Sequence, residues 1–154
     1  MQSDLALFVR EQTDIFKENT SFFEALRDII TASLENGSKQ LTGVLTVQGR
    51  VKTLSSYAEK CLRRRGRFSQ PAWQLTDLCG VRVIVTSKDD IEPIRQFIQT
   101  SFEIDENEDT ALRLGEMEFG YQSVHYIVSL SKEREALYQA TGLTIPEELY
   151  ARRD

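Results

Sequence analysis

The spacing of hydrophobic positions predicts two helices at the start of the chain. Apolar residues recur at helical spacing over 4–17 and again over 22–34. Asn19-Thr20-Ser21 interrupts the two runs, and Ser21 with Glu24 forms a capping-box pattern. Asn36-Gly37 is a typical helix stop. We therefore expect N-terminal helices between residues 4 and 36.

Three later segments alternate with the period of two that is typical of β-strands. These segments are 41–52, 77–86 and 119–130. Between them the pattern predicts helices over 54–65 and from residue 87 onward, then a further strand near residue 102 and C-terminal helices over 132–154. This order predicts an α/β (α+β) fold, in which helices pack on a mixed sheet of about four to five strands with one open face. We expect one domain over 1–154, with its central part at 40–130.

Composition narrows the class of protein. The chain has 154 residues, 28% of them charged and 40% hydrophobic, which is normal for a globular domain. It has neither an apolar run of membrane-spanning length nor the pattern of a signal peptide, so we expect a cytoplasmic protein without a membrane partner. A net charge of −5 argues against a general nucleic-acid coat. Cys61 and Cys79 match no metal-ligand spacing and are expected to be reduced thiols.

Cationic side chains follow the first predicted strand. Arg50 and Lys52 share one face at its end, and Ser56 and Lys60 lie one turn apart on the next helix. The run at 63–67, which contains four arginines, continues that helix face. A basic helix end is often only a solvated surface that suits the helix dipole. Here it extends a row of cations that a triphosphate would need.

The other two strands also carry polar residues. Asp77 precedes the second strand, where it is either a salt-bridge partner or a ligand for Mg²⁺, and both interpretations stay open. Arg82 lies on the polar face of the same strand. In the third strand, Tyr121, Ser123 and His125 share one face, which taken alone is typical of a solvated sheet surface. Polar residues on three strands of one sheet favour a single ligand site.

These residues together resemble a known family. The elements are Gly49-Arg50-Val51-Lys52, then Ser56 and Lys60, then Asp77-Leu78-Cys79-Gly80-Val81-Arg82, then Gly120-Tyr121-Gln122-Ser123-Val124-His125. In order and spacing they resemble the RelA/SpoT-type alarmone (ppGpp) synthetase domain, over about residues 40 to 130. No hydrolase or regulatory region accompanies them, so we expect either a small stand-alone synthetase or a fragment of a larger chain. The resemblance implies a nucleotidyltransferase-like synthetase fold.

The resemblance implies transfer of pyrophosphate from ATP to the 3′-hydroxyl of GDP or GTP, as in a GTP pyrophosphokinase of the stringent response. It implies that Arg50 contacts the adenine, that Lys52, Ser56 and Lys60 hold the ATP phosphates, and that Arg82 supports that site. Asp77 would hold Mg²⁺, the implied cofactor. The catalytic set is then Lys52, Lys60, Asp77 and Arg82. Tyr121, Ser123 and His125 would bind the acceptor nucleotide.

The sequence also departs from the family pattern. The Glu-x-Gln strand that usually follows is missing after His125, so we expect either a chain cut before its last catalytic strand or an inactive nucleotide-binding module. Only Lys88 stands where a further arginine often covers the adenine, and residues 106–109 are acidic. Toxic relatives modify adenine nucleotides or the 3′ end of tRNA, and this acceptor stays an alternative. Assembly of several copies is left open.

Overall fold

A computed structural model describes residues 2–105 and 124–150 of the chain. Its internal contacts divide these residues into two compact units. The first unit contains residues 2–31 and 48–82, and the second contains residues 32–47, 83–105 and 124–150. The expectation of one domain over 1–154 stays a prediction. No helix among the described residues has the length and apolar character needed to cross a membrane.

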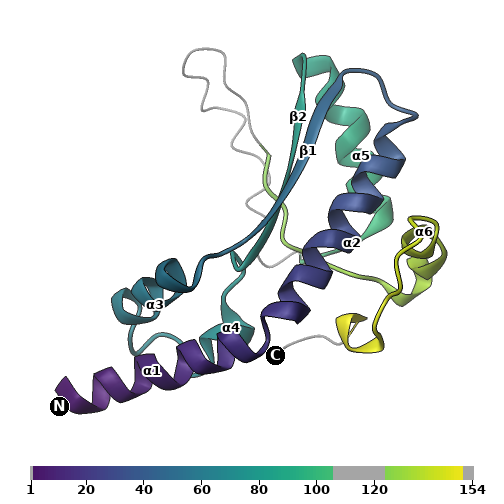
Figure 1. The fold of residues 1–154 in the computed structure, drawn as a ribbon. Coiled ribbons are helices and arrows are strands. Elements are labelled where there is room, and N and C mark those ends of the chain that lie inside the picture. Colours follow the sequence, from purple (N-terminus) through teal and green to yellow (C-terminus); the bar gives the residue numbers. More distant parts are fainter. Residues whose placement is uncertain (1, 106–123, 151–154) are drawn as a thin grey trace. The chain divides into compact units, whose positions relative to one another are not determined.

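Four helices build most of the first unit. Helix α1 (Gln2–Glu18) is followed at once by α2 (Thr20–Ser38), whose first part belongs to this unit. The chain turns at Asn19, whose side-chain amide donates a hydrogen bond to the carbonyl of Ile15 at 2.7 Å. Helix α1 packs against α3 (Leu54–Arg63) and α4 (Pro71–Gln74), as Figure 1 shows. The two N-terminal helices and the helix after residue 54 are thus as the periodicity predicts.

Aromatic rings fill the interior of the first unit. The ring of Phe16 on α1 stacks on that of Tyr57 on α3, with centroids 4.3 Å apart. The ring of Trp73 packs against that of Phe23, with centroids 5.7 Å apart, and Trp73 is partly buried against the core. The buried cluster is Phe16, Phe23, Tyr57, Cys61, Ala72 and Leu78. These residues come from every helix of the unit, so their burial holds α3 in place against α1.

Strands β1 (Val44–Val51) and β2 (Cys79–Val85) pair as a two-stranded sheet. The amide of Lys52 donates to the carbonyl of Leu78 at 2.8 Å, and the amide of Thr86 donates to the carbonyl of Gly43 at 2.8 Å. Residue numbers that rise along β1 are paired with residue numbers that fall along β2, so the two strands run antiparallel. In the second unit β3 (Glu103–Ile104) and β4 (Val128–Ser129) form another antiparallel pair.

The α+β class is as the sequence predicts, but the sheet content is smaller. The described residues form two separate two-stranded sheets, where the sequence predicted one mixed sheet of four to five strands. Part of the predicted strand at 119–130 lies outside the described residues, and within 124–130 only two residues pair. Helix α5 (Ile91–Ser101) uses the residues before β3, so little chain is left there for a longer strand.

Two glycines mark places where a helix approaches its neighbour closely. A Cβ on Gly49 of β1 would lie 2.2 Å from Thr31 Oγ1 of α2, within the first unit. In the second unit a Cβ on Gly37 would lie 2.0 Å from the ring of Phe97 on α5. The expectation that Gly37 ends its helix is wrong by a short distance, because α2 continues to Ser38. Its missing side chain admits the Phe97 ring.

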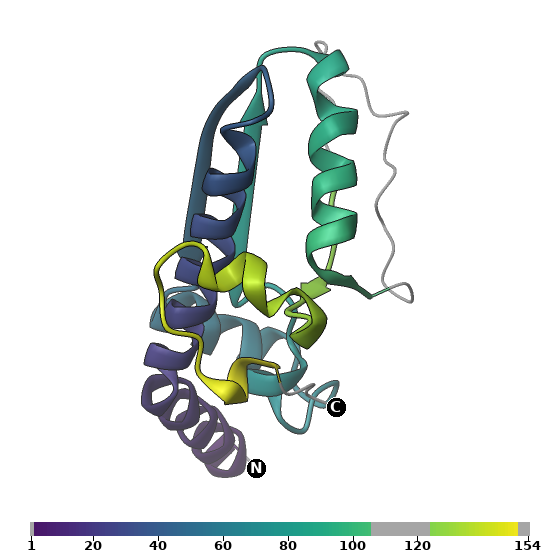
Figure 2. The same ribbon diagram turned by 90° about the vertical axis from the view of Figure 1, so that its right-hand side faces the viewer.

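The second unit is completed by short helices after β4. They are η3 (Lys132–Arg134), α6 (Glu135–Gln139) and η4 (Glu147–Tyr150), with η1 (Lys88–Asp90) leading into α5. Figure 2 shows α5 and α6 in this part of the chain. Tyr138 of α6 is fully buried, and its hydroxyl donates to the carbonyl of Ser101 at 2.6 Å. The same oxygen accepts from the amide of Ser131 at 3.0 Å. One phenol therefore ties α6 to the end of α5.

Candidate active site

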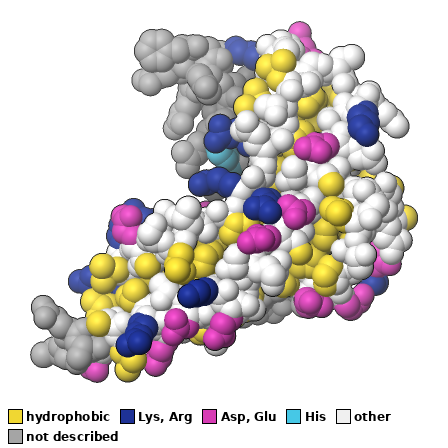
Figure 3. All heavy atoms as spheres, in the orientation of Figure 1, with side chains coloured by type: hydrophobic (Ala, Val, Ile, Leu, Met, Phe, Trp, Pro, Cys, Tyr) yellow, Lys and Arg dark blue, Asp and Glu magenta, His cyan; other side chains and the backbone are white. Residues whose placement is uncertain are grey.

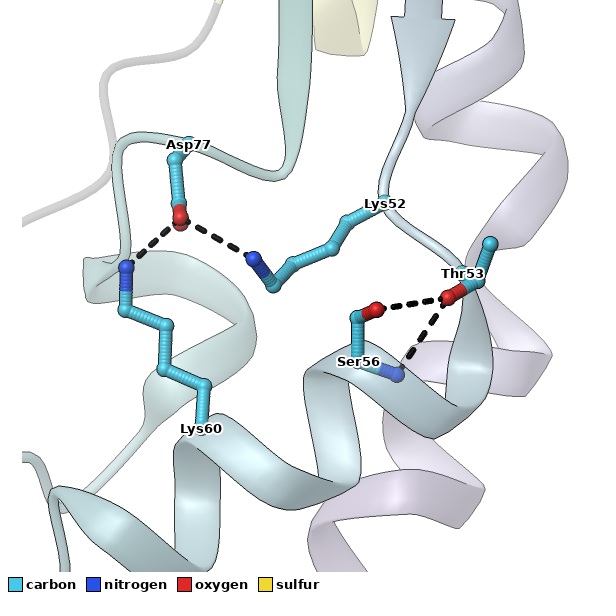
Figure 4. Close-up of polar contacts among 5 residues, drawn as sticks. All are labelled: Lys52, Thr53, Ser56, Lys60 and Asp77. Carbon is cyan, nitrogen blue, oxygen red and sulfur yellow. Dashed lines mark hydrogen bonds and ion pairs between the residues drawn. The ribbon is translucent and has the colours of Figure 1, made fainter.

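Two lysines converge on one carboxylate in the first unit (Figure 4). The ammonium of Lys60 lies 2.6 Å from Asp77 Oδ2, and that of Lys52 lies 3.2 Å from the same oxygen. The residues are far apart in sequence and come from three elements. Lys52 follows β1, Lys60 lies on α3, and Asp77 precedes β2. Two of the cations predicted for a phosphate site are thus brought together.

Backbone hydrogen bonds hold these side chains in place. The amide of Lys52 donates to the carbonyl of Leu78, so the residue after β1 is fixed beside the residue after Asp77. Thr53 then caps α3, because its backbone is extended and its side chain accepts from the amide of Ser56 at 3.2 Å. A helix that begins at this residue places Lys60 two turns along, facing the carboxylate. The hydrogen bond between the strand ends and the start of α3 at Thr53 together position both ammonium groups.

The charges in this cluster are only partly in contact with solvent. The side chains of Lys52 and Lys60 are 15% and 18% exposed, and that of Asp77 is 37% exposed. Partial burial acts to raise the pKa of Asp77, but hydrogen bonds and charge from Lys60 and Lys52 outweigh it and lower that pKa. Asp77 is therefore ionised at neutral pH. The cluster carries two positive charges against one negative charge.

The second oxygen of Asp77 has a different environment. Oδ1 is buried and has no hydrogen-bond partner among the described residues, while Oδ2 accepts from both lysines. A buried carboxylate oxygen without a donor is costly, since it has lost its hydration. Of the two interpretations of Asp77, the salt-bridge partner is seen directly in Oδ2.

Ser56 lies in the first turn of α3, one turn before Lys60 (Figure 4). Its hydroxyl oxygen accepts a hydrogen bond from Thr53 Oγ1 at 2.9 Å, and its side chain is exposed. The N-terminal end of a helix favours anions because its free amides carry partial positive charge. A hydroxyl, a helix N-terminus and two lysines therefore lie within one short stretch of the first unit.

The two arginines of the predicted ATP site are also in the first unit. Arg50 on β1 and Arg82 on β2 are both exposed. The Arg50 side chain lies alongside Gly80, where an added Cβ would be 3.8 Å from Arg50 Nε. The absence of a side chain at residue 80 leaves Arg50 uncovered on the surface of the strand pair. Neither arginine contacts the Asp77 carboxylate.

Of the three predicted acceptor residues, the structure describes only His125. Tyr121 and Ser123 lie outside the described residues. His125 is exposed and belongs to the second unit. The acceptor half of the site stays a prediction, and the description of the site rests on the first unit alone.

Sequence reasoning missed one residue of the site. Thr53 makes two hydrogen bonds to Ser56, one to its amide and one to its hydroxyl. The signal was present in the sequence, since a threonine before an apolar helix with a serine three residues later is typical of an N-cap. Residue 53 falls between the predicted strand over 41–52 and the predicted helix over 54–65, and neither prediction gave it a role.

Comparison with known proteins places the chain in a family. The family model described as "Region found in RelA / SpoT proteins" matches residues 49–141, which is more than half of the chain. The chain belongs to the RelA/SpoT family. The matched segment contains every residue predicted for the site, from Arg50 to His125. The resemblance seen in the sequence motifs is confirmed, and the general class is a pyrophosphokinase-type transferase.

Among solved structures, one similar to this RelA/SpoT chain is the small alarmone synthetase 1 from Bacillus subtilis, in a crystal structure bound to AMPCPP. The two chains are 17% identical, with 91% of this chain and 84% of that chain covered, and the TM-score is 0.42. No curated protein matches the chain. The family assignment rests on the match over residues 49–141.

Proposed function

We propose that this protein transfers pyrophosphate from ATP to the 3′-hydroxyl of GDP or GTP. In this reaction the acceptor oxygen bonds to the β-phosphorus of ATP, and the bond from that phosphorus to the α–β bridging oxygen breaks. AMP leaves with the electron pair of that bond, and the acceptor hydroxyl loses its proton. The observation that carries the proposal is the convergence of Lys52 and Lys60 on Asp77 within the segment matched by the family.

The chemistry suits these residues because pyrophosphoryl transfer needs positioning and charge neutralisation more than a protein nucleophile. Lys52 and Lys60 would bind the β- and γ-phosphates, and Ser56 would donate to a phosphate oxygen at the start of α3. The negative charge of ATP would then take the place of the Asp77 carboxylate as a partner of the ammonium groups. Arg50 would contact the adenine from the exposed strand surface, and Arg82 would support the phosphates.

Asp77 would hold Mg²⁺. The buried Oδ1 atom without a donor is the kind of hard oxygen ligand that Mg²⁺ accepts, and this cation usually takes one or two carboxylates with phosphate oxygens and waters. No group of three metal-ligating side chains occurs among the residues that the structure describes. Bound there, the ion would neutralise charge on the transferred group.

The acceptor nucleotide would be bound by Tyr121, Ser123 and His125, as the family resemblance implies. A guanine stacked on the Tyr121 ring would gain on the order of 1–3 kcal/mol, enough to place an acceptor. The matched segment supports this assignment, since it includes all three positions.

The test is incubation of this chain, and of a version that includes the Glu-x-Gln strand, with ATP labelled in its γ-phosphate, Mg²⁺ and either GDP or GTP, followed by separation of the nucleotides. We expect a labelled guanosine product carrying pyrophosphate at its 3′ position. Lys60→Ala and Lys52→Ala should each reduce its formation by at least about 100-fold, because each removes a cation at the developing charge. Lys39→Ala, an exposed lysine outside the cluster, is the matched control and should keep full activity.

Two other outcomes would select the alternative functions. ATP binding by calorimetry without any transfer would indicate a nucleotide-binding module, as the missing Glu-x-Gln strand suggests. Label transferred to tRNA, with steep salt dependence, would favour an RNA acceptor for the exposed arginines at 63–67. On the face in Figure 3, acidic and basic side chains are interspersed over α1. The net charge of −5 favours the nucleotide acceptor over an RNA acceptor.

A further inference from the structure

The side chain of Thr53 makes a directed pair of hydrogen bonds. Its Oγ1 accepts from the amide of Ser56 at 3.2 Å and donates to Ser56 Oγ at 2.9 Å. Thr53 is thereby more than the N-cap of α3, because a cap needs only the bond to the amide. The second bond reaches the hydroxyl that is proposed to bind phosphate. A third neighbour, Ser55 Oγ, lies farther away at 3.4 Å.

The direction of the second bond determines what Ser56 can do. A serine hydroxyl has one proton and two acceptor lone pairs. Because the proton of Thr53 occupies a lone pair of Ser56 Oγ, the proton of Ser56 is left for another acceptor. A hydroxyl whose oxygen already accepts a bond is also a stronger donor, since hydrogen bonds in a chain polarise one another. A phosphate oxygen, which can only accept, is the matching ligand.

We propose that Thr53 is a positioning residue for the ATP phosphates, which orients the Ser56 hydroxyl as a donor. The inference rests on the proposed function, because it assumes that Ser56 binds ATP. Thr53 acts through Ser56 and touches no reacting atom. Loss of the Thr53 hydroxyl would leave the Ser56 hydroxyl free to rotate, and the donor would no longer be held toward the phosphate.

A purely structural role makes a different prediction. If Thr53 only capped α3, its loss would weaken the helix start whatever residue stood at position 56. The amide of residue 56 is present in Ser56→Ala as well, so the capping bond survives that substitution. A positioning role, in contrast, disappears once the Ser56 hydroxyl is gone. A double-mutant cycle between the two positions separates these roles.

The experiment measures ATP affinity by calorimetry, with Mg²⁺ present and no acceptor nucleotide. Thr53→Val should weaken affinity by about 3- to 10-fold, the range for one hydrogen bond. In the Ser56→Ala background the same change should cost less than about 2-fold, while the melting temperature falls alike in both backgrounds. Thr53→Ser, which keeps both bonds, should restore affinity. Ser55→Ala is the matched control and should bind ATP as the unaltered chain does.

Each contrary result has one meaning. An equal loss of affinity in both backgrounds overturns the inference and leaves Thr53 as a cap alone. Failure of Thr53→Ser to restore binding does the same, because serine supplies the hydroxyl that the inference requires. If the unaltered chain binds no ATP, the proposed function falls, and the role of Thr53 falls with it. Binding of ATP by the unaltered chain with an additive cycle therefore contradicts only the inference.

Discussion

Replacing Asp77 by asparagine is expected to destabilise the first unit. The substitution keeps an oxygen that can accept from Lys52 and Lys60 but removes the charge, and it places an amide where the buried Oδ1 has no partner. Charge-assisted hydrogen bonds contribute about 1.5–3 kcal/mol each. Since the Asp77 side chain is 37% exposed, solvent screening reduces that figure. We expect a loss of roughly 1–2 kcal/mol in the free energy of unfolding.

The assay is thermal unfolding followed by circular dichroism, in EDTA so that no divalent cation contributes. For a chain of this length the loss corresponds to a fall of roughly 2–8 °C in melting temperature. Asp28→Asn is the matched control, because Asp28 also pairs with a cation, Arg27 at 2.9 Å, but its side chain is 56% exposed. Exposed pairs of this kind contribute about 0–1 kcal/mol, so the control should change little.

The pH dependence gives a second readout. The pKa of Asp77 is lower in the folded protein, so its ion pairs add stability above the unfolded pKa of about 3.9. That contribution is lost as the pH falls through the folded pKa. The difference in melting temperature between the unaltered chain and Asp77→Asn should be at its full size at pH 6–8 and should shrink as the pH falls below about 4. Equal melting temperatures for the Asp77 and Asp28 variants, or a gap that persists in acid, would refute the reasoning.

Three further predictions concern other parts of the chain. Gly49→Ala should destabilise by about 1–3 kcal/mol in denaturant unfolding, because its Cβ would meet α2 at 2.2 Å, whereas Gly80→Ala, with 3.8 Å of room, should not. Tyr138→Phe, which breaks two hydrogen bonds of a buried phenol, should cost about 2–3 kcal/mol, and the half-buried Tyr126→Phe less than about 1 kcal/mol. Burial raises the pKa of Cys79 to about 11, so iodoacetamide at pH 7.5 should label it at least about 100-fold more slowly than after unfolding, and equal rates would contradict this.

Local periodicity was sufficient for the elements of the first unit. The helix from Leu54 and the spacing of Ser56 and Lys60 depend on contacts a few residues apart, which the sequence states directly. The interruption at Asn19 was predictable for the same reason. The motif order also identified the family, because each motif is a short run of adjacent residues.

Strand pairing was predicted less well. A two-residue strand such as β3 leaves almost no alternation to detect, and the residues of its partner β4 lie 24 and 26 positions further along the chain. The role of Gly37 was misjudged for a related reason, since its close neighbour Phe97 lies 60 positions further along the chain.

The sequence by itself determined which residues are chemically able to bind a triphosphate, and tertiary structure decided which of them meet. Nothing local links Asp77 to Lys60, 17 residues earlier, or to Lys52, 25 residues earlier. They share one oxygen because burial of Phe16 and Tyr57 packs α3 on α1 while the Lys52–Leu78 hydrogen bond aligns the strand ends. Long-range packing places these charges, because side chains so distant in sequence meet only when the core between them has formed.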